Sequence, residues 1–128
     1  MAYTYHIDVE AGLLVIVSDA EPMTQAERID AMRVWMSDPA YRPGLDTLLD
    51  LSGTPSTPSL AQLQEIATYI DRRAESVGRK KIAVVTTTPV TYGVARQFQA
   101  LTDTGPLTVK VFGARGDAME WLGRGSSA

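Results

Sequence analysis

The spacing of apolar residues changes along the chain, and each spacing predicts a different element of secondary structure. Apolar and polar residues alternate over 3–10, which predicts a strand with one face exposed to water. Residues 13–17 form a continuous apolar run, typical of a strand buried on both faces. Because Ala11 and Gly12 make a tight turn between them, we expect a β-hairpin whose first strand lies at or near a sheet edge.

A helical spacing of three to four residues follows the hairpin. Thr24 and Glu27 have the spacing of a capping box, and apolar residues then recur at helical spacing through Met36. We expect this helix to end before Asp38-Pro39, because proline disfavours a helical conformation in the residue ahead of it.

The clearest amphipathic helix in the sequence covers residues 60–77, where apolar residues recur every three or four positions. Ser59 is its predicted N-cap, Gln62 completes a capping box, and Gly78 suits the C-terminal cap. A further helix is predicted over about 90–101.

Apolar runs between the helices predict three more strands, over residues 45–51, 81–85 and 107–112. A short helix over 118–122, with Asp117 as its cap, ends the pattern. The predicted order is therefore β-β-α-β-α-β-α-β-α. Strands that alternate with helices favour an α/β fold, in which right-handed crossovers give a mostly parallel sheet of four to five strands after an N-terminal hairpin.

Length and charge limit the class of protein. The 128 residues suit one domain, which we place at 1–123, followed by a flexible polar tail at 124–128. A net charge of −3 gives no electrostatic footprint for nucleic acid. The sequence shows neither a signal-peptide pattern nor an apolar run long enough to span a bilayer, so we expect a cytoplasmic protein without a transmembrane segment.

Few side chains in the sequence are arranged as catalysis or metal binding requires. The chain has no cysteine, and no Asp, Glu or His stands at ligand spacing with Asp50, so we expect no metal and no cofactor. His6 is the only histidine and has no serine or cysteine motif to serve. The elbow motif of serine hydrolases and the glycine-rich phosphate loops are absent. We therefore predict no catalytic residues.

The third predicted strand ends in Asp50-Leu51-Ser52-Gly53, which together with the element order resembles a known family. The chain resembles the STAS domain of sulfate-transporter tails and anti-sigma-factor antagonists, and more closely the SpoIIAA-like family of small bacterial proteins. The 81–85 strand and the ending Val111-Phe112 followed by 118–122 also match. The resemblance covers nearly the whole chain and implies a sheet stacked in roughly sequential order with helices packed against it.

The same resemblance singles out Ser59. Anti-sigma-factor antagonists carry a phosphorylated serine at the start of the second helix, within an Asp-Ser-Ser-Gly-like motif, and the alignment of motifs places Ser59 there as a candidate phosphoacceptor. A helix N-terminus stabilises a phosphate dianion through its free amides. However, Pro58, Leu60 and Ala61 stand where the acid, the second serine and the glycine belong, so the kinase-docking signature is missing. The simpler interpretation of Ser59 is a plain N-cap.

Two loops at one end of the predicted sheet gather polar residues. In the predicted fold, the loop after Asp50 lies beside the loop over 86–89, and two helix N-termini with an arginine would receive a phosphate or a carboxylate. The alternative is ordinary turn capping and a solvated arginine. The candidate residues for binding a partner or a ligand are Asp50, Ser52, Ser56, Ser59, Thr88, Tyr92 and Arg96.

Three functions stay open at this point. The first is a non-enzymatic regulatory or adaptor domain that binds a protein partner through the loop at the start of the 60–77 helix. The second is a carrier that holds a small apolar or lipid-like molecule between sheet and helices, which an enlarged pocket would favour. The third is an enzyme of unrecognised type with a water-excluding cleft around Asp50 or His6. A homodimer through the edge strand or an apolar helix face also stays open.

Overall fold

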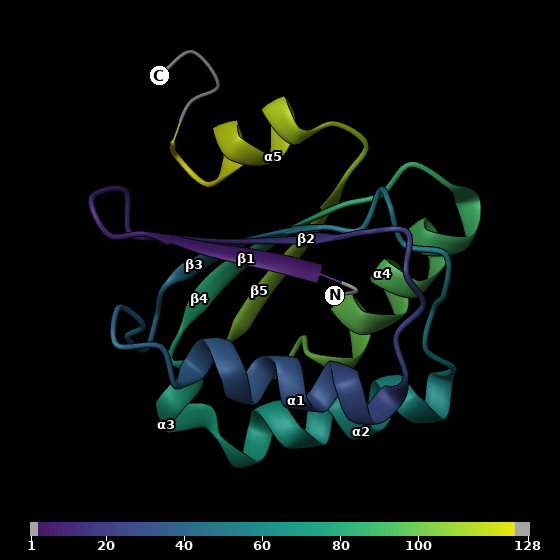
Figure 1. Cartoon of the computed structure of the whole chain (residues 1–128), viewed down its shortest axis with the longest axis horizontal. Coiled ribbons are helices and arrows are strands. Elements are labelled where there is room, and N and C mark those ends of the chain that lie inside the picture. The colour runs from purple at the N-terminus through teal and green to yellow at the C-terminus, as the bar shows by residue number, and fades with distance from the viewer. Residues whose placement is uncertain (1–2, 125–128) are drawn as a thin grey trace.

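The computed structural model of the chain describes residues 3–124 and has a single sheet with helices on both sides (Figure 1). The order of elements confirms the predicted α/β pattern and adds one short helix. The elements are β1 (Tyr3–Asp8), β2 (Leu13–Ser18), α1 (Gln25–Met36), β3 (Asp46–Asp50), α2 (Leu60–Arg72), α3 (Ala74–Val77), β4 (Lys80–Val85), α4 (Pro89–Leu101), β5 (Leu107–Phe112) and α5 (Arg115–Trp121). No helix among these is long and apolar enough to cross a bilayer.

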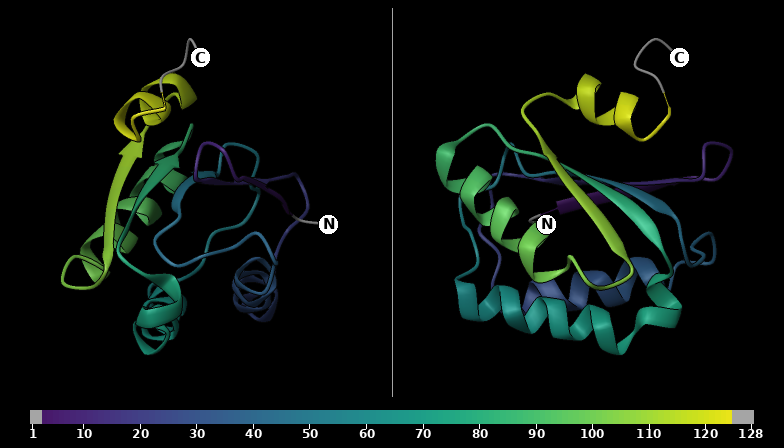
Figure 2. Two further views of the ribbon diagram at one scale, coloured as in Figure 1. Left: turned by 90° about the vertical axis from the view of Figure 1, so that its left-hand side faces the viewer. Right: turned by 180° about the vertical axis from the view of Figure 1, so that it is seen from behind.

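The strands lie side by side in chain order, from β1 to β5. β1 and β2 form the predicted antiparallel hairpin, and every later pair of neighbours is parallel. Because each right-handed crossover moves one strand further in the same direction, the connecting helices α1, α2 and α4 are all placed on one face. Figures 1 and 2 show α1 and α2 on one side of the sheet and α5 on the other.

The three long helices begin in the same way. In each helix the side chain of the N-cap residue accepts a hydrogen bond from the backbone amide of the residue three positions later. The side chain of that later residue in turn accepts a hydrogen bond from the amide of the cap. The N-cap residues are Thr24 of α1, Ser59 of α2 and Thr88 of α4. Each side chain thus satisfies amides that the first helical turn leaves without a partner. The predicted capping boxes at Thr24 and Ser59 are confirmed, and Thr88 adds a third.

Two predicted helix boundaries are wrong. The helix predicted over 60–77 breaks at Arg73, whose φ of −115° and ψ of 30° leave the helical region. The break turns the chain so that α3 reaches Gly44, whose amide donates to the Val77 carbonyl at 2.9 Å. Gly78 follows with a φ of +71°, and a Cβ there would lie 2.4 Å from the Gly44 nitrogen, so the close approach requires glycine.

The last helix also differs from the prediction. α5 begins at Arg115, so Asp117 lies inside its first turn and does not cap it. The residue at the cap position is Ala114, which makes no side-chain hydrogen bond to the helix. An acidic side chain in the first turn still interacts favourably with the helix dipole.

Alternation along the strands divides the core between the two faces. The α5 face packs Leu48, Ala83, Ala118 and Leu122 into one cluster. The other face directs Ile82 and Val84, among others, toward the helices. β2 is less buried than its continuous apolar run predicts, because Val15 and Val17 stay half-buried on the side that the short α5 covers only in part.

Candidate functional site

The three helices on one face do not close completely against the sheet. A partly enclosed cavity of about 230 Å³ lies between the strands and α1, α2 and α4. Most of its wall is apolar, including Ile16, Leu49, Ile82, Val84, Met32, Leu63, Ile66, Val94 and Phe98. Protein interiors rarely leave voids much larger than a water molecule. An apolar cavity of about 150 Å³ is already large enough to hold a benzene molecule.

The strand order explains why the space lies mainly between the sheet and the helices, with loop residues lining only its carboxyl-edge end. In open α/β sheets a ligand crevice forms at the carboxyl edge where the strand order reverses and neighbouring loops diverge. This sheet runs from β1 to β5 without a reversal. The loops at the carboxyl edge, where the sequence placed its candidate site, therefore lack such a crevice.

Two cationic side chains line the cavity from opposite ends. Arg28 is in the early part of α1, which follows β2 at the carboxyl edge, and the loop residues Thr54 and Ser56 line that end with it. Lys80 is the first residue of β4 and therefore lies at the amino edge. The sequence analysis singled out neither cation.

Lys80 lies in mainly apolar surroundings. Burial lowers the pKa of its ammonium from 10.5 to about 8, while the negative charge of Asp46 acts weakly in the opposite direction. Its Nζ lies 5.8 Å from the centre of the Tyr41 ring. Within residues 3–124 the ammonium makes neither a hydrogen bond nor an ion pair, so its charge has no direct partner there.

Arg28 is the less isolated of the two cations. It donates a hydrogen bond to the side chain of Gln25 at 3.3 Å, and burial lowers its pKa. It lies at the loop end of the cavity, where hydroxyl groups are numerous. The cavity thus has a polar end near Arg28 and an apolar end that contains one lysine.

Asp50 forms a compact cluster at the carboxyl edge. Its Oδ1 accepts hydrogen bonds from the Ser52 amide at 2.9 Å and the Ser52 hydroxyl at 2.6 Å, and its Oδ2 accepts one from Arg115 at 2.9 Å. Burial raises the pKa of Asp50, but these hydrogen bonds outweigh burial and bring the pKa below its ordinary value. The ionised carboxylate therefore ties β3 to its own loop and to α5.

Sequence reasoning missed Arg115, although a signal was present. Arg115 follows β5 directly, and the carboxyl ends of parallel β3 and β5 lie at the same edge of the sheet. The sequence could have predicted the pairing only from the opposite charges of Arg115 and Asp50 at that shared edge.

The other predicted site residues lie outside the Asp50 cluster, and Ser56 among them lines the cavity. Ser59 and Thr88 are exposed N-caps, and the Ser56 hydroxyl accepts the Met23 amide at 3.3 Å beside the cavity. Arg96 donates to the Tyr92 hydroxyl at 2.8 Å along the outside of α4. Among the described residues, the structure records no contact that brings Arg96 to the Asp50 loop, and Arg115 takes that place. Within residues 3–124, no group of three His, Asp or Glu side chains is arranged to hold a metal ion.

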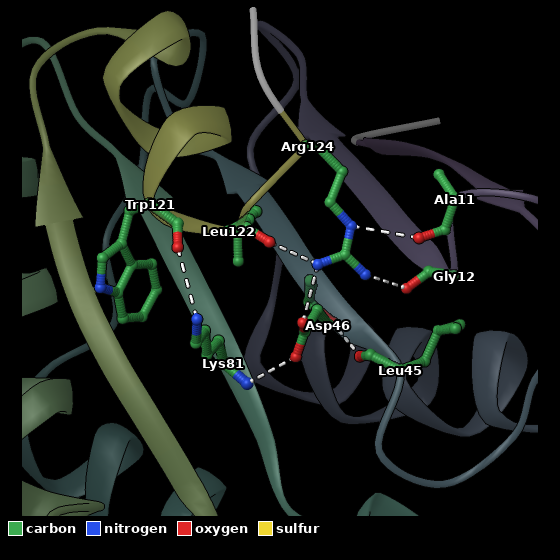
Figure 3. A network of polar contacts seen from close by, with 9 residues as sticks. Ala11, Gly12, Leu45, Asp46, Lys81, Trp121, Leu122 and Arg124 are labelled. Atoms are coloured by element: carbon green, nitrogen blue, oxygen red, sulfur yellow. Dashed lines mark hydrogen bonds and ion pairs between the residues drawn. The ribbon is translucent and has the colours of Figure 1, made fainter.

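A second polar network lies at the amino edge and is structural (Figure 3). Arg124 donates to the carbonyls of Ala11 at 3.1 Å and Gly12 at 2.9 Å, and pairs with Asp46 at 2.9 Å. The other oxygen of Asp46 accepts the Lys81 amide at 2.9 Å. Arg124, which the sequence assigned to the tail, thus fastens the end of α5 to the hairpin turn. The remainder of the predicted tail, 125–128, lies outside the described residues.

Comparisons with known proteins agree with this architecture. The sequence matches no known family profile and no curated protein. Among solved structures it is similar to an uncharacterised protein of the DUF3478 family from Shewanella loihica PV-4, described as having a SpoIIAA-like fold. The two chains are 14% identical, 94% of each is covered, and the TM-score is 0.63. The predicted fold is therefore confirmed, and this chain has the SpoIIAA-like fold.

Proposed function

We propose that this chain is a non-enzymatic domain that binds a small apolar molecule in the cavity between the sheet and α1, α2 and α4. The observation that carries the proposal is the cavity itself, with its volume of about 230 Å³ and its apolar wall. Cavity formation in a core costs stability, by roughly 24 cal/mol for each Å³. A bound apolar molecule recovers the contacts that the wall side chains otherwise lack.

The polar groups of the wall also favour binding over catalysis. The Thr47 hydroxyl donates to the Leu45 carbonyl at 3.1 Å, and the Thr91 hydroxyl donates to the Thr88 carbonyl at 3.1 Å. Both hydroxyls are therefore occupied within the protein. General acid–base or nucleophilic catalysis needs a reactive group within hydrogen-bond reach of a second, activating group. The described wall residues provide no such pair.

The test is to reduce the volume of the cavity. Ala95 is buried and lines the cavity from α4, whereas Ala100 is exposed on the same helix. We expect Ala95→Leu to weaken the binding of the neutral fluorescent probe N-phenyl-1-naphthylamine by about tenfold. Ala100→Leu serves as the matched control and leaves probe affinity unchanged. Equal affinities for wild type and Ala95→Leu would contradict the proposal.

A protein partner is the second candidate, because three large apolar side chains are exposed near the starts of α2 and α4. Leu60 is 49% exposed, Val90 is 65% exposed and Tyr92 is 47% exposed. Native mass spectrometry of the protein purified from its own host distinguishes the two candidates. A small-molecule mass on the chain supports the cavity, and a defined protein complex supports the helix starts.

A further inference from the structure

We infer that the apolar ligand of this cavity carries a single carboxylate, and that this carboxylate pairs with the ammonium of Lys80. The inference rests on the proposed function and specifies the class of ligand, an aliphatic or aromatic monocarboxylate. It starts from a charge in the cavity wall that the described protein leaves unpaired.

The direction of the Lys80 side chain follows from strand alternation. Lys80 shares the parity of Ile82 and Val84, and all three line the cavity. Lys81 points to the opposite face, where its Nζ donates to the Trp121 carbonyl at 3.4 Å and lies 5.3 Å from the indole centre. Two consecutive lysines therefore differ in partners, and only the one that faces the cavity lacks a hydrogen bond.

Among residues 3–124, the groups recorded near Lys80 are already occupied or apolar. Asp46 acts on it through space, but its carboxylate accepts hydrogen bonds from Arg124 and from the Lys81 amide. The Tyr41 hydroxyl donates to the Ser76 carbonyl at 3.0 Å. Val77 and Leu107, which are buried, complete this end of the wall. A half-buried charge without an ionic partner is less favourable than a paired one, and an anion supplied by a ligand provides that partner.

The number of donors selects the anion. A lone ammonium is a compact single charge, which matches one carboxylate through a charge-assisted hydrogen bond. A phosphate dianion carries a larger charge and normally requires several donors, such as an arginine fork or a row of helix amides. The described wall around Lys80 offers neither. The apolar remainder of the cavity suits the hydrocarbon part of the same molecule.

The experiment compares two competitors of equal chain length. Decanoate and 1-decanol displace N-phenyl-1-naphthylamine from wild type and from two variants, Lys80→Met and Lys81→Met. We expect Lys80→Met to weaken the binding of decanoate by about tenfold and to change the affinity for 1-decanol by less than about twofold. Lys81→Met removes the neighbouring charge, which faces the α5 side of the sheet, and leaves the affinity for decanoate nearly unchanged.

A second measurement does not depend on a variant. Nitrogen-detected NMR of the wild-type protein can measure the pKa of the Lys80 ammonium. We expect decanoate to raise this pKa, whereas 1-decanol leaves the pKa unchanged or lowers it. Unaltered decanoate affinity in Lys80→Met, or an equal loss in Lys81→Met, would overturn the assignment of Lys80 while the cavity proposal stands. Failure of the probe to bind wild type at all would overturn the proposed function and this inference together.

Discussion

The two faces of the sheet are covered in opposite ways. A single short helix, α5, covers one face, and there Ala83 and Ala118 are both fully inaccessible to solvent. Three long helices cover the other face, yet they leave a cavity of about 230 Å³. More helix therefore does not mean tighter packing.

The size of the contacting residues explains the difference. Small side chains such as Ala118 let α5 approach the sheet closely where it packs against Leu48 and Ala83. On the other face, long side chains such as Met32 and Phe98 hold the helices away from the strands. Under the proposed function, the face covered by α1, α2 and α4 would hold the ligand, while the α5 face supports the fold.

The largest expected effect tests this difference in packing. Leu48 is buried in the α5 cluster, and Leu63 is buried in the cavity wall. We expect Leu48→Ala to lower the free energy of unfolding by about 3–5 kcal/mol and Leu63→Ala by about 2–3 kcal/mol, because Leu63 already lacks contacts on its cavity side. Urea denaturation measures both. Equal losses would show that the wall around Leu63 is packed as tightly as the α5 face.

The second prediction compares the consecutive lysines on the two faces. The pKa of Lys80 is about 8 in the folded protein against 10.5 for an ordinary lysine. The folded state therefore binds fewer protons than the unfolded state between pH 8 and pH 10.5, and stability rises with pH in that window. Below pH 8 the buried charge opposes folding, so we expect Lys80→Met to stabilise the protein by about 1–3 kcal/mol at pH 7.

This gain should shrink as the pH rises through the same window. Lys81→Met is the matched control, since Lys81 faces the α5 side and has the Trp121 carbonyl as a partner. We expect that control to be neutral or slightly destabilising, with no dependence on pH between 8 and 10. Thermal unfolding at several pH values measures both variants, and a Lys80→Met protein less stable than wild type at pH 7 would contradict the prediction.

The smallest expected effect concerns how the cavity wall is held. Ser59 caps α2, which forms part of that wall, and accepts the Gln62 amide at 3.2 Å. We expect Ser59→Ala to cost about 1 kcal/mol through loss of the cap. Ser76→Ala is the control, because Ser76 is exposed and only its backbone carbonyl is used. An unchanged midpoint of unfolding for Ser59→Ala would mean that packing alone fixes the start of α2.

Much of the fold was predictable because its signals are local. Alternation and apolar runs located all five strands, and the spacing of Ser59 and Gln62 located the start of α2. The break at Arg73 was not predictable, because the apolar spacing continues through it and the contact that it allows, between Val77 and Gly44, joins segments distant in sequence. Local sequence patterns do not predict a turn that is linked to contacts with a loop distant in sequence.

The candidate site was harder to predict for the same reason. Asp50 was singled out as a binding candidate, whereas the structure shows it in an ion pair with Arg115, which lies 65 residues away in the chain. The cavity depends on how far three helices stand from the sheet, which no periodicity encodes. The position of Lys80 could have been predicted from the sequence, because Lys80 alternates in step with the inward residues Ile82 and Val84.

The chain-ordered sheet also has a consequence for the route by which the protein folds. Each strand pairs only with its neighbours in the chain, so the sheet can grow by adding one strand at a time to an exposed edge, with short loop closures. The contact of Arg124 with Ala11 joins positions 113 residues apart. In the unfolded chain, closure of so long a loop is entropically costly, so we expect this contact to form after assembly of the sheet has brought its ends together and to contribute little to the folding transition state.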